Sequence, residues 1–394
     1  MTLELTHLIA QVEALGQNRD QQTTAKQQLA QQAKGLLKQF ATAFDELDER
    51  IQQAERVQEA VRFSWLGAAP SGEALDRYQP EPDGPEQVTI IASDGSQIYP
   101  DRHAIALYYL VNIGLIVYQQ GSQNRPEVQS LPSLYYEQAD LFDENTGLLN
   151  PPGVVNVKRD LGEIEVLANL ATAYQNQGRP VLALMDGRLT LRTIDLPARQ
   201  QKAYETRYLS YLNQLQENGA TIAAYIDKPL SSFVVALVHL AGLEPQEINE
   251  DSLRNNPYLG LTDSDLFDDL EPGQRTAIFN QRAKANIEYD KAGHRVHFFY
   301  LNTGTETSPN LVRVEIPGWV AEDPDRLATL HTTLLRQARL AGGYPYVLAR
   351  AHELAIIPPK EREALETMLA VSLRRQGQPA EVSRKQYNKN LLTR

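Results

Sequence analysis

Cysteine is absent from this chain of 394 residues. Its absence excludes disulfide bonds, cysteine-ligated zinc, iron–sulfur clusters and any thiol nucleophile. A chain without cysteine suits a reducing compartment, so we expect a cytoplasmic protein. Residues 1–7 lack the basic start and apolar run of a signal peptide. Long apolar runs are also missing: the longest, over residues 104–117, is interrupted by Asn112 and Gly114 and predicts strands, not a membrane span.

Positive charge is scarce as well. The chain has 38 Lys and Arg residues against 50 Asp and Glu, a net charge of -12. This balance argues against a protein that coats DNA electrostatically, but not against an enzyme with a local basic patch or a helping partner. Residues 372–394 are the exception, because Glu381 is the one acidic residue among six basic ones: Arg374, Arg375, Arg384, Lys385, Lys389 and Arg394. They form either a solvated tail or an arm that contacts phosphates.

The length predicts two or three domains, and a hydrophobic content of 42% is sufficient for globular cores. Residues 1–66 have apolar side chains at three- and four-residue steps, which predicts an amphipathic helical hairpin or short coiled coil with a break at Gly16. Residues 67–86 are rich in proline and glycine and predict a linker. A domain over 87–360 and a C-terminal helix with a basic tail over 361–394 complete the expected organisation.

The order of elements after the linker predicts the fold class. Residues 88–93 form a strand, and 104–110 with 113–119 form a tight hairpin or one long bent strand pair. After a loop of about 40 residues, helices and strands alternate: helix 160–177, strand 181–185, helix 198–218, strand 221–226 and helix 231–240. The order β-β-β-α-β-α-β-α predicts an α/β protein with a mixed sheet and flanking helices. It is the layout of the ribonuclease H-like fold, although sugar kinases and actin-like ATPases share a similar order.

Two predicted strands each deliver an aspartate to a glycine. Asp94-Gly95-Ser96 follows strand 88–93, and Asp186-Gly187 follows strand 181–185. One Asp-Gly pair alone is an ordinary turn. Two carboxylates on strands that pair side by side form a plausible metal site, because hard divalent cations bind clustered carboxylate oxygens.

Helix 160–177 supplies a third carboxylate. Glu163 borders the apolar stripe of this helix, whereas Glu165 lies on its solvent face. Glu163 either pairs with Arg159 one turn earlier or joins Asp94 and Asp186 as a metal ligand or water-orienting group. In two-metal hydrolases one cation activates a water and the other stabilises the leaving oxygen, which suits a phosphodiester substrate.

A last signal lies near the C-terminus, where a proline turn leads into a helix. His352 aligns there with Leu348 and Ala355 at helical spacing. A histidine on an apolar helix face is either a packed core residue or a ligand.

Together these residues resemble the NurA nuclease family. The family pattern has an Asp-Gly-Ser after the first strand, a glutamate near an arginine on the next helix, and a second Asp-Gly. It continues with a tyrosine or basic residue after the fifth strand and ends in Pro-x-x-Leu-x-x-Ala-His. The matching positions are Asp94-Gly95-Ser96, Arg159 with Glu163, Asp186-Gly187, residues 225–229, and Pro345, Leu348, Ala351 and His352. The likeness covers residues 87–360.

The resemblance implies manganese-dependent (or magnesium-dependent) DNA hydrolysis, with 5′-to-3′ exonuclease and single-strand endonuclease activity in DNA end resection and repair. It also implies a homodimer that works with a hexameric HerA-type ATPase. Asp94, Glu163 and Asp186 are then metal ligands, and His352 is a further ligand or a transition-state stabiliser. At the fifth strand Tyr225, Asp227 and Lys228 compete for one role, and Tyr225 is preferred.

Two alternatives belong to other classes. An actin-like or sugar-kinase-like ATPase would need a second glycine-rich phosphate loop, and residues 186–189 contain no glycine run. A non-catalytic scaffold would use the N-terminal helices to dimerise.

Overall fold

The computed structural model describes residues 5–61, 65–144, 146–193 and 196–378. They divide into two compact units. Unit 1 consists of Met1–Asp83 and Ile226–Pro324, and unit 2 of Gly84–Tyr225 and Asp325–Arg394. The chain therefore passes between the units three times. Within the described residues no helix is both long and apolar enough to cross a membrane.

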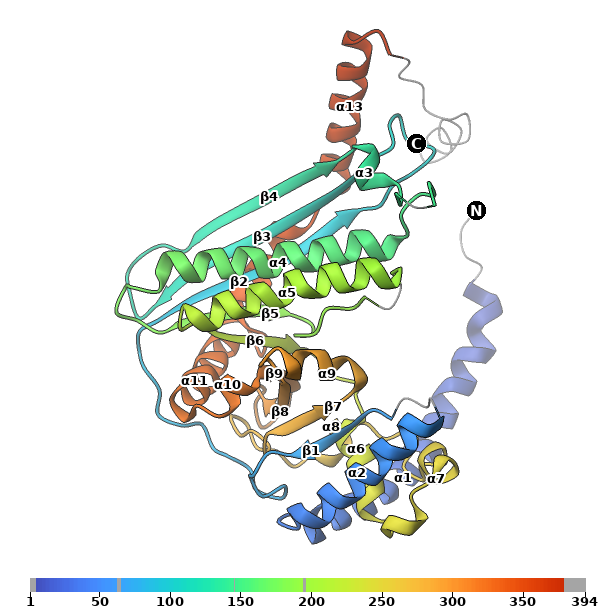
Figure 1. Cartoon of the computed structure of the whole chain (residues 1–394). Helices are drawn as coiled ribbons and strands as arrows, with labels where there is room; N and C mark the ends of the chain where they lie inside the picture. The colour runs from blue at the N-terminus through green and yellow to red at the C-terminus, as the bar shows by residue number, and fades with distance from the viewer. Residues whose placement is uncertain (1–4, 62–64, 145, 194–195, 379–394) are drawn as a thin grey trace. The chain divides into compact units, whose positions relative to one another are not determined.

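Unit 2 is built on five neighbouring strands (Figure 1). They are β2 (Val88–Ile98), β3 (Tyr109–Gln120), β4 (Glu127–Tyr135), β5 (Val181–Asp186) and β6 (Thr221–Ile226). Their spatial order is β6-β5-β2-β3-β4. Strands β2, β3 and β4 are antiparallel neighbours, while β5 runs parallel to β2 and β6 parallel to β5. This arrangement confirms the ribonuclease H-like fold class.

Helices cover both faces of these strands. Helices α4 (Pro152–Tyr174) and α5 (Ala198–Glu217) lie side by side on one face (Figure 1). Helix α12 (Tyr346–Ala355) packs on the other face. Two serines of β2 show this, because residues an odd number of positions apart in a strand point to opposite faces. Ser93 Oγ donates to the Glu163 carbonyl in α4, and Ser96 Oγ donates to the Ala355 carbonyl in α12. The unit also contains α3 (Gln138–Leu141), α11 (Pro324–Leu340) and α13 (Pro359–Arg375).

Three predicted elements of unit 2 differ from the structure. Residues 104–108 are not a strand, and β3 is one continuous strand, so the predicted 104–110/113–119 hairpin is wrong. The partner of β3 is β4, which lies in the predicted loop; this edge strand is exposed along most of its length and contains Pro132, so it lacks an apolar alternation. Helix α4 begins at Pro152, before the predicted Asp160, because proline is well accommodated in the first helical turn.

Unit 1 pairs four antiparallel strands in the order β1-β7-β8-β9. They are β1 (Gly67–Pro70), β7 (Phe279–Arg282), β8 (Val296–Asn302) and β9 (Leu311–Pro317). Its helical elements are η1 (Leu5–Leu8), α1 (Ile9–Gln39), α2 (Phe44–Val61), α6 (Phe233–Ala241), η2 (Pro245–Glu247), α7 (Glu250–Arg254), α8 (Asp263–Leu266), α9 (Lys284–Lys291) and α10 (Gly318–Ala321).

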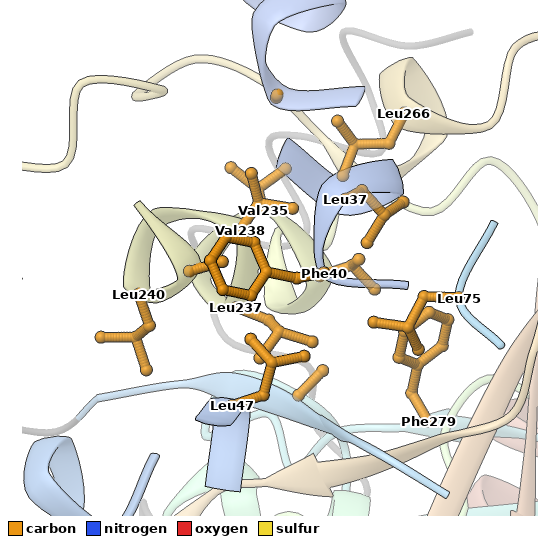
Figure 2. Close-up of a cluster of buried hydrophobic side chains, with 14 of the residues drawn as sticks. Leu37, Phe40, Leu47, Leu75, Val235, Leu237, Val238, Leu240, Leu266 and Phe279 are labelled. Atoms are coloured by element: carbon orange, nitrogen blue, oxygen red, sulfur yellow. The ribbon is translucent and has the colours of Figure 1, made fainter. Parts of the chain in front are cut away.

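The core of unit 1 forms around α6, against which both α1 and α2 pack (Figure 2). Leu37 of α1 and Leu47 of α2 belong with Val238 of α6 to one buried cluster, and each such side chain contributes about 1.5–3 kcal/mol when fully buried. Helix α1 runs through Gly16 without the predicted break. The predicted 67–86 linker is also wrong in part, because it contains β1 and the buried Leu75.

Candidate active site

Asp94 lies inside strand β2 and not in a turn, which corrects the sequence expectation. The strand continues to Ile98, with Asp94 opposite Gly114 of β3. The Asp94 side chain is 15% exposed and faces α12. Its Oδ1 accepts from the Gly95 amide at 2.8 Å, and its Oδ2 is 2.6 Å from His352 Nδ1.

Asp186 is the last residue of the adjacent strand β5. Because β2 and β5 are parallel, with Ser93 beside Met185, the two aspartates occupy neighbouring positions. Gly187 then makes the expected turn with a φ of 98°. Asp186 reaches solvent, yet the surrounding protein displaces enough water to raise its pKa; the negative charge of Asp94 raises this pKa further. Hydrogen bonding to Tyr344 and the proximity of His352 oppose that rise.

Glu163 approaches β2 from the other face. Burial raises its pKa well above the usual range, and the charges of Asp160, Asp94 and Asp186 add to this rise. Arg159 Nε lies 3.4 Å from Glu163 Oε1 and favours the charged form. Glu163 therefore forms the ion pair with Arg159, and at the same time the negative charges of Asp94 and Asp186 raise its pKa. Glu165, by contrast, reaches solvent and pairs with Arg207 at 3.3 Å.

Gly95 makes this approach possible. A Cβ atom at this position would lie 2.5 Å from Arg159 Cγ and 2.6 Å from Glu163 Oε1. Real Cβ atoms do not tolerate such distances, so any side chain here would push both groups away. The glycine serves close packing beneath the strand, whereas Gly187 serves a turn.

The three carboxylates do not form a ready-made ligand set. In the described part of the chain, no three Asp, Glu or His side chains are grouped closely enough to hold a metal ion. Instead each carboxylate has a protein partner: Asp94 has His352, Asp186 has Tyr344, and Glu163 has Arg159. The donor chemistry nevertheless suits a hard divalent cation, because Asp94 and Asp186 are neighbouring carboxylates and the charge of Asp94 raises the pKa of Asp186.

His352 is not a packed core residue, although its helical spacing allowed one. Its side chain is 60% exposed, while Leu348 and Ala355 on the same helix are buried. Its neighbour Glu353 is exposed and pairs with Arg350.

Helix α12 is held against the strands by small and amide side chains. Asn112 Nδ2 donates to the Leu354 carbonyl at 3.1 Å and to the Ala355 carbonyl at 2.9 Å. Gly114 lets the helix backbone approach, since a Cβ there would be 2.3 Å from the Ala351 carbonyl oxygen. These contacts fix the position of His352 beside Asp94.

Two tyrosines complete the centre. Tyr225 pairs with Asp186 in the strand register, is fully buried, and donates to the Gly343 carbonyl at 3.3 Å. The ring of Tyr344 meets it edge-on, with centroids 5.3 Å apart. Burial raises the pKa of the Tyr344 hydroxyl, which is hydrogen-bonded to Asp186.

Sequence reasoning missed Tyr344, although it lies in the turn immediately before the helix that carries His352. Tyr225 lies beside Asp186 in the strand register, as a buried residue in edge-on contact with Tyr344. The other candidates at this strand, Asp227 and Lys228, belong to unit 1 and take part in none of these contacts.

Fold and site together define an α/β protein of the ribonuclease H-like class, with an acidic centre where strand β5 ends beside Asp94 of the longer strand β2. A family model described as the NurA domain matches residues 88–357, more than half of the chain. The chain therefore belongs to the NurA family.

Solved structures show more distant likeness. The crystal structure of the NurA nuclease from Sulfolobus solfataricus covers 86% of this chain and 96% of its own, at 14% identity and a TM-score of 0.48. The catalytic domain of human endonuclease V covers 81% of this chain and 97% of its own, at 14% identity and a TM-score of 0.33. A comparison with curated proteins finds no match. The family assignment rests on the match over residues 88–357.

Proposed function

We propose that this protein is a metal-dependent nuclease that hydrolyses phosphodiester bonds in DNA. The observation that carries the proposal is the pair Asp94 and Asp186, on adjacent parallel strands, with Glu163 close enough for all three charges to interact. Membership of the NurA family supports the same reaction. Residues 87–360 would form the nuclease part of the chain.

Asp94 and Asp186 would hold the cation, with Glu163 and His352 as further ligands or orienting groups. A bound divalent cation lowers the pKa of a water molecule and neutralises charge on the phosphate. Of the two candidate metals we propose Mn²⁺ over Mg²⁺. To bring its oxygens to the cation, each carboxylate must loosen its present contact, as Asp94 does with His352.

The chain's own residues would share the remaining work. Arg159 holds the Glu163 carboxylate in place beneath Gly95. Tyr344 donates to Asp186 and thereby orients it. When His352 Nδ1 donates to Asp94, its Nε2 presents a lone pair; on protonation Nε2 becomes a donor for a phosphate oxygen. The ring of Tyr225 packs edge-on against the ring of Tyr344 and would hold it in place.

Finer features of the proposal concern substrate and partners. We propose 5′-to-3′ exonuclease and single-strand endonuclease activity in DNA end resection and repair, in the cytoplasm. The protein would act as a homodimer with a HerA-type hexameric ATPase. A partner that feeds DNA to the site would offset the repulsion expected between DNA and a chain of net charge -12.

Substitution of the aspartates tests the reaction. Asp94→Asn or Asp186→Asn should lower the rate of manganese-dependent cleavage of labelled single-stranded DNA by at least about a thousandfold, because carboxylate ligands are lost. Circular dichroism and thermal unfolding should match the wild type. Glu163→Gln should also be strongly impaired, whereas Glu165→Gln on the same helix is the matched control and should cleave normally. Unchanged cleavage by both aspartate variants would refute the assignment of the site, and a wild type that cleaves no DNA would support the scaffold alternative.

A further inference from the structure

Beyond Gly95, two more side chains from the end of β2 contact helix α4. Gln97 Oε1 accepts from Arg159 Nη1 at 3.2 Å, and the Tyr99 hydroxyl donates to Asn156 Oδ1 at 2.5 Å. Residues two positions apart in a strand share a face, so Gln97 and Tyr99 follow Gly95 on the same side of the sheet. These side chains form a polar row that leads from the acidic centre toward solvent, because Tyr99 is 40% exposed.

Hydrogen bonds within this row fix the orientation of the Gln97 amide. The Tyr99 hydroxyl has one hydrogen and gives it to Asn156, so its oxygen accepts from Gln97 Nε2, at 2.9 Å. The amide nitrogen of Gln97 therefore points to Tyr99, and its amide oxygen points to Arg159. In this orientation Gln97 offers the guanidinium of Arg159 an acceptor.

The hydrogen bonds of Arg159 go to Asp160 and Gln97. Its Nε and Nη2 donate to Asp160 Oδ1 at 3.1 and 2.6 Å, and its Nη1 donates to Gln97. Glu163 Oε1 lies 3.4 Å from Arg159 Nε, in an ion pair that is longer than these hydrogen bonds. The positive charge of Arg159 thus acts on Glu163, while its hydrogen bonds are made elsewhere.

This division matters because arginine and a cation compete for the same carboxylate oxygens. Arginine and a carboxylate readily form short, charge-assisted hydrogen bonds, often two at once. The side chain of Glu163 is 7% exposed and that of Arg159 is 29% exposed, so little water would compete with such a contact. If Arg159 turned fully to Glu163, a cation would have to break that contact before it could bind the Glu163 oxygens.

We propose that Gln97 is a positioning residue that draws Arg159 away from Glu163 and so leaves the Glu163 carboxylate available to a divalent cation. Asp160 shares this role, and the Tyr99 hydroxyl holds the Gln97 amide in the orientation that it requires. The inference rests on the proposed nuclease function. It adds residues that set the affinity for the cation without touching it.

Binding of Mn²⁺ to the full-length protein without DNA tests the inference. Electron paramagnetic resonance of free Mn²⁺ gives the affinity independently of cleavage. Gln97→Met has nearly the same size but no acceptor, so Arg159 can turn to Glu163 and the affinity for Mn²⁺ should fall about tenfold. Gln119→Met is the matched control, because Gln119 of β3 accordingly contacts Gln177, beyond the far end of α4. The control should bind Mn²⁺ like the wild type.

Two further variants distinguish positioning from a merely structural role. In an Arg159→Met background, Gln97→Met should have no further effect on the affinity for Mn²⁺, because Gln97 acts through Arg159. The same tenfold loss in that background would overturn the inference. Gln97→Glu keeps an acceptor for Arg159 and should bind Mn²⁺ at least as tightly as the wild type, whereas weaker binding would show that the acceptor has no such role.

The outcomes separate this inference from the proposed function. If the wild type binds Mn²⁺ and cleaves DNA but Gln97→Met binds Mn²⁺ equally tightly, the role of Gln97 is wrong and the nuclease proposal stands. If the wild type neither binds Mn²⁺ nor cleaves DNA, the proposed function fails and the inference fails with it. If Gln97→Met does not fold, Tyr99→Phe replaces it: about twofold weaker Mn²⁺ binding is expected, and wild-type affinity would overturn the inference.

Discussion

Gly95 lies where any side chain would displace Arg159 and Glu163, on the face of β2 that α4 covers. In Gly95→Ala the new Cβ would meet Arg159 Cγ and Glu163 Oε1, both on movable side chains. The fold should therefore survive, with a stability cost of about 1–2 kcal/mol. Displacement of Glu163 should lower kcat for DNA cleavage by about tenfold or more, measured beside thermal unfolding. Normal kcat in Gly95→Ala would show that Glu163 has no part in the reaction.

Asp263 illustrates a buried charge with a structural role in unit 1. Its carboxylate accepts from the amides of Phe233, Val234 and Val235 at 3.0, 2.8 and 2.9 Å and from the Tyr300 hydroxyl at 2.6 Å. These bonds hold the start of α6. Burial nevertheless raises the pKa of Asp263 to about 6, above the usual value near 3.8.

A raised carboxyl pKa makes folding less favourable as pH rises. The folded state retains its proton up to about pH 6, whereas the unfolded chain loses it near pH 4, so this contribution to stability falls through pH 6. Between pH 5 and 7.5 the wild type should lose about 1.4 kcal/mol relative to Asp263→Asn, which does not titrate. Urea unfolding of both proteins at the two pH values measures this difference. Parallel pH dependence of the two proteins would contradict it.

Helix α12 owes its position to the absence of a side chain at Gly114. In Gly114→Ala the Cβ would meet the Ala351 carbonyl oxygen at 2.3 Å, and a backbone atom cannot simply rotate away. The helix must shift, carrying His352 from Asp94. We expect a loss of about 2 kcal/mol or more in unfolding free energy and a fall in kcat.

Gly35 provides the matched control for Gly114→Ala. It lies within α1 with no atom within 4 Å of an added Cβ. Gly35→Ala should raise stability by about 0.5–1 kcal/mol and leave cleavage unchanged. Equal thermal unfolding temperatures for the two variants would contradict the close packing of α12.

Elements bounded by glycine or proline were predictable from the sequence. Gly219 ends α5 near its predicted limit, and β6 matches residues 221–226. Strand β4 was not predictable because it is an exposed edge strand, whose side chains need no alternation. Because β4 carries no such signal, the sequence pattern places both the second and the third strand within residues 104–119, which contain only β3. In the site, the positions of the carboxylates after the predicted strands and on the predicted helix indicated the acidic residues. The sequence did not indicate that Asp94 faces α12 while Gly95 faces α4, on opposite sides of one strand.

At the scale of the whole molecule, charge distribution decides how DNA is bound. Arg374 and Arg375 end α13, whose Leu365 and Leu369 pack on Ile98 and its neighbours. The other basic residues of the tail, from Arg384 to Arg394, lie outside the described residues. The tail as a phosphate-contacting arm therefore stays a prediction.

Salt dependence tests that arm. Replacement of Arg374, Arg375, Arg384 and Lys385 by Gln should reduce the slope of log affinity for single-stranded DNA against log salt by about 0.7 for each lost phosphate contact. The control variant replaces four basic residues on the surface of unit 1, namely Arg254, Lys284, Lys291 and Arg295, and should keep the wild-type slope. An unchanged slope in the tail variant would favour a solvated tail.

The three passages of the chain between the units have a consequence during biosynthesis. Arg50 in α2 donates to the Leu243 carbonyl, across 193 residues of sequence. At about 5–20 residues per second, a ribosome needs about 10–40 s to supply that partner. Until then the apolar faces of α1 and α2 have emerged without α6 to cover them. The nascent polypeptide is therefore expected to depend on chaperones, and removal of the segment before Gly84 would strip unit 1 of α1, α2 and β1, which its other half requires.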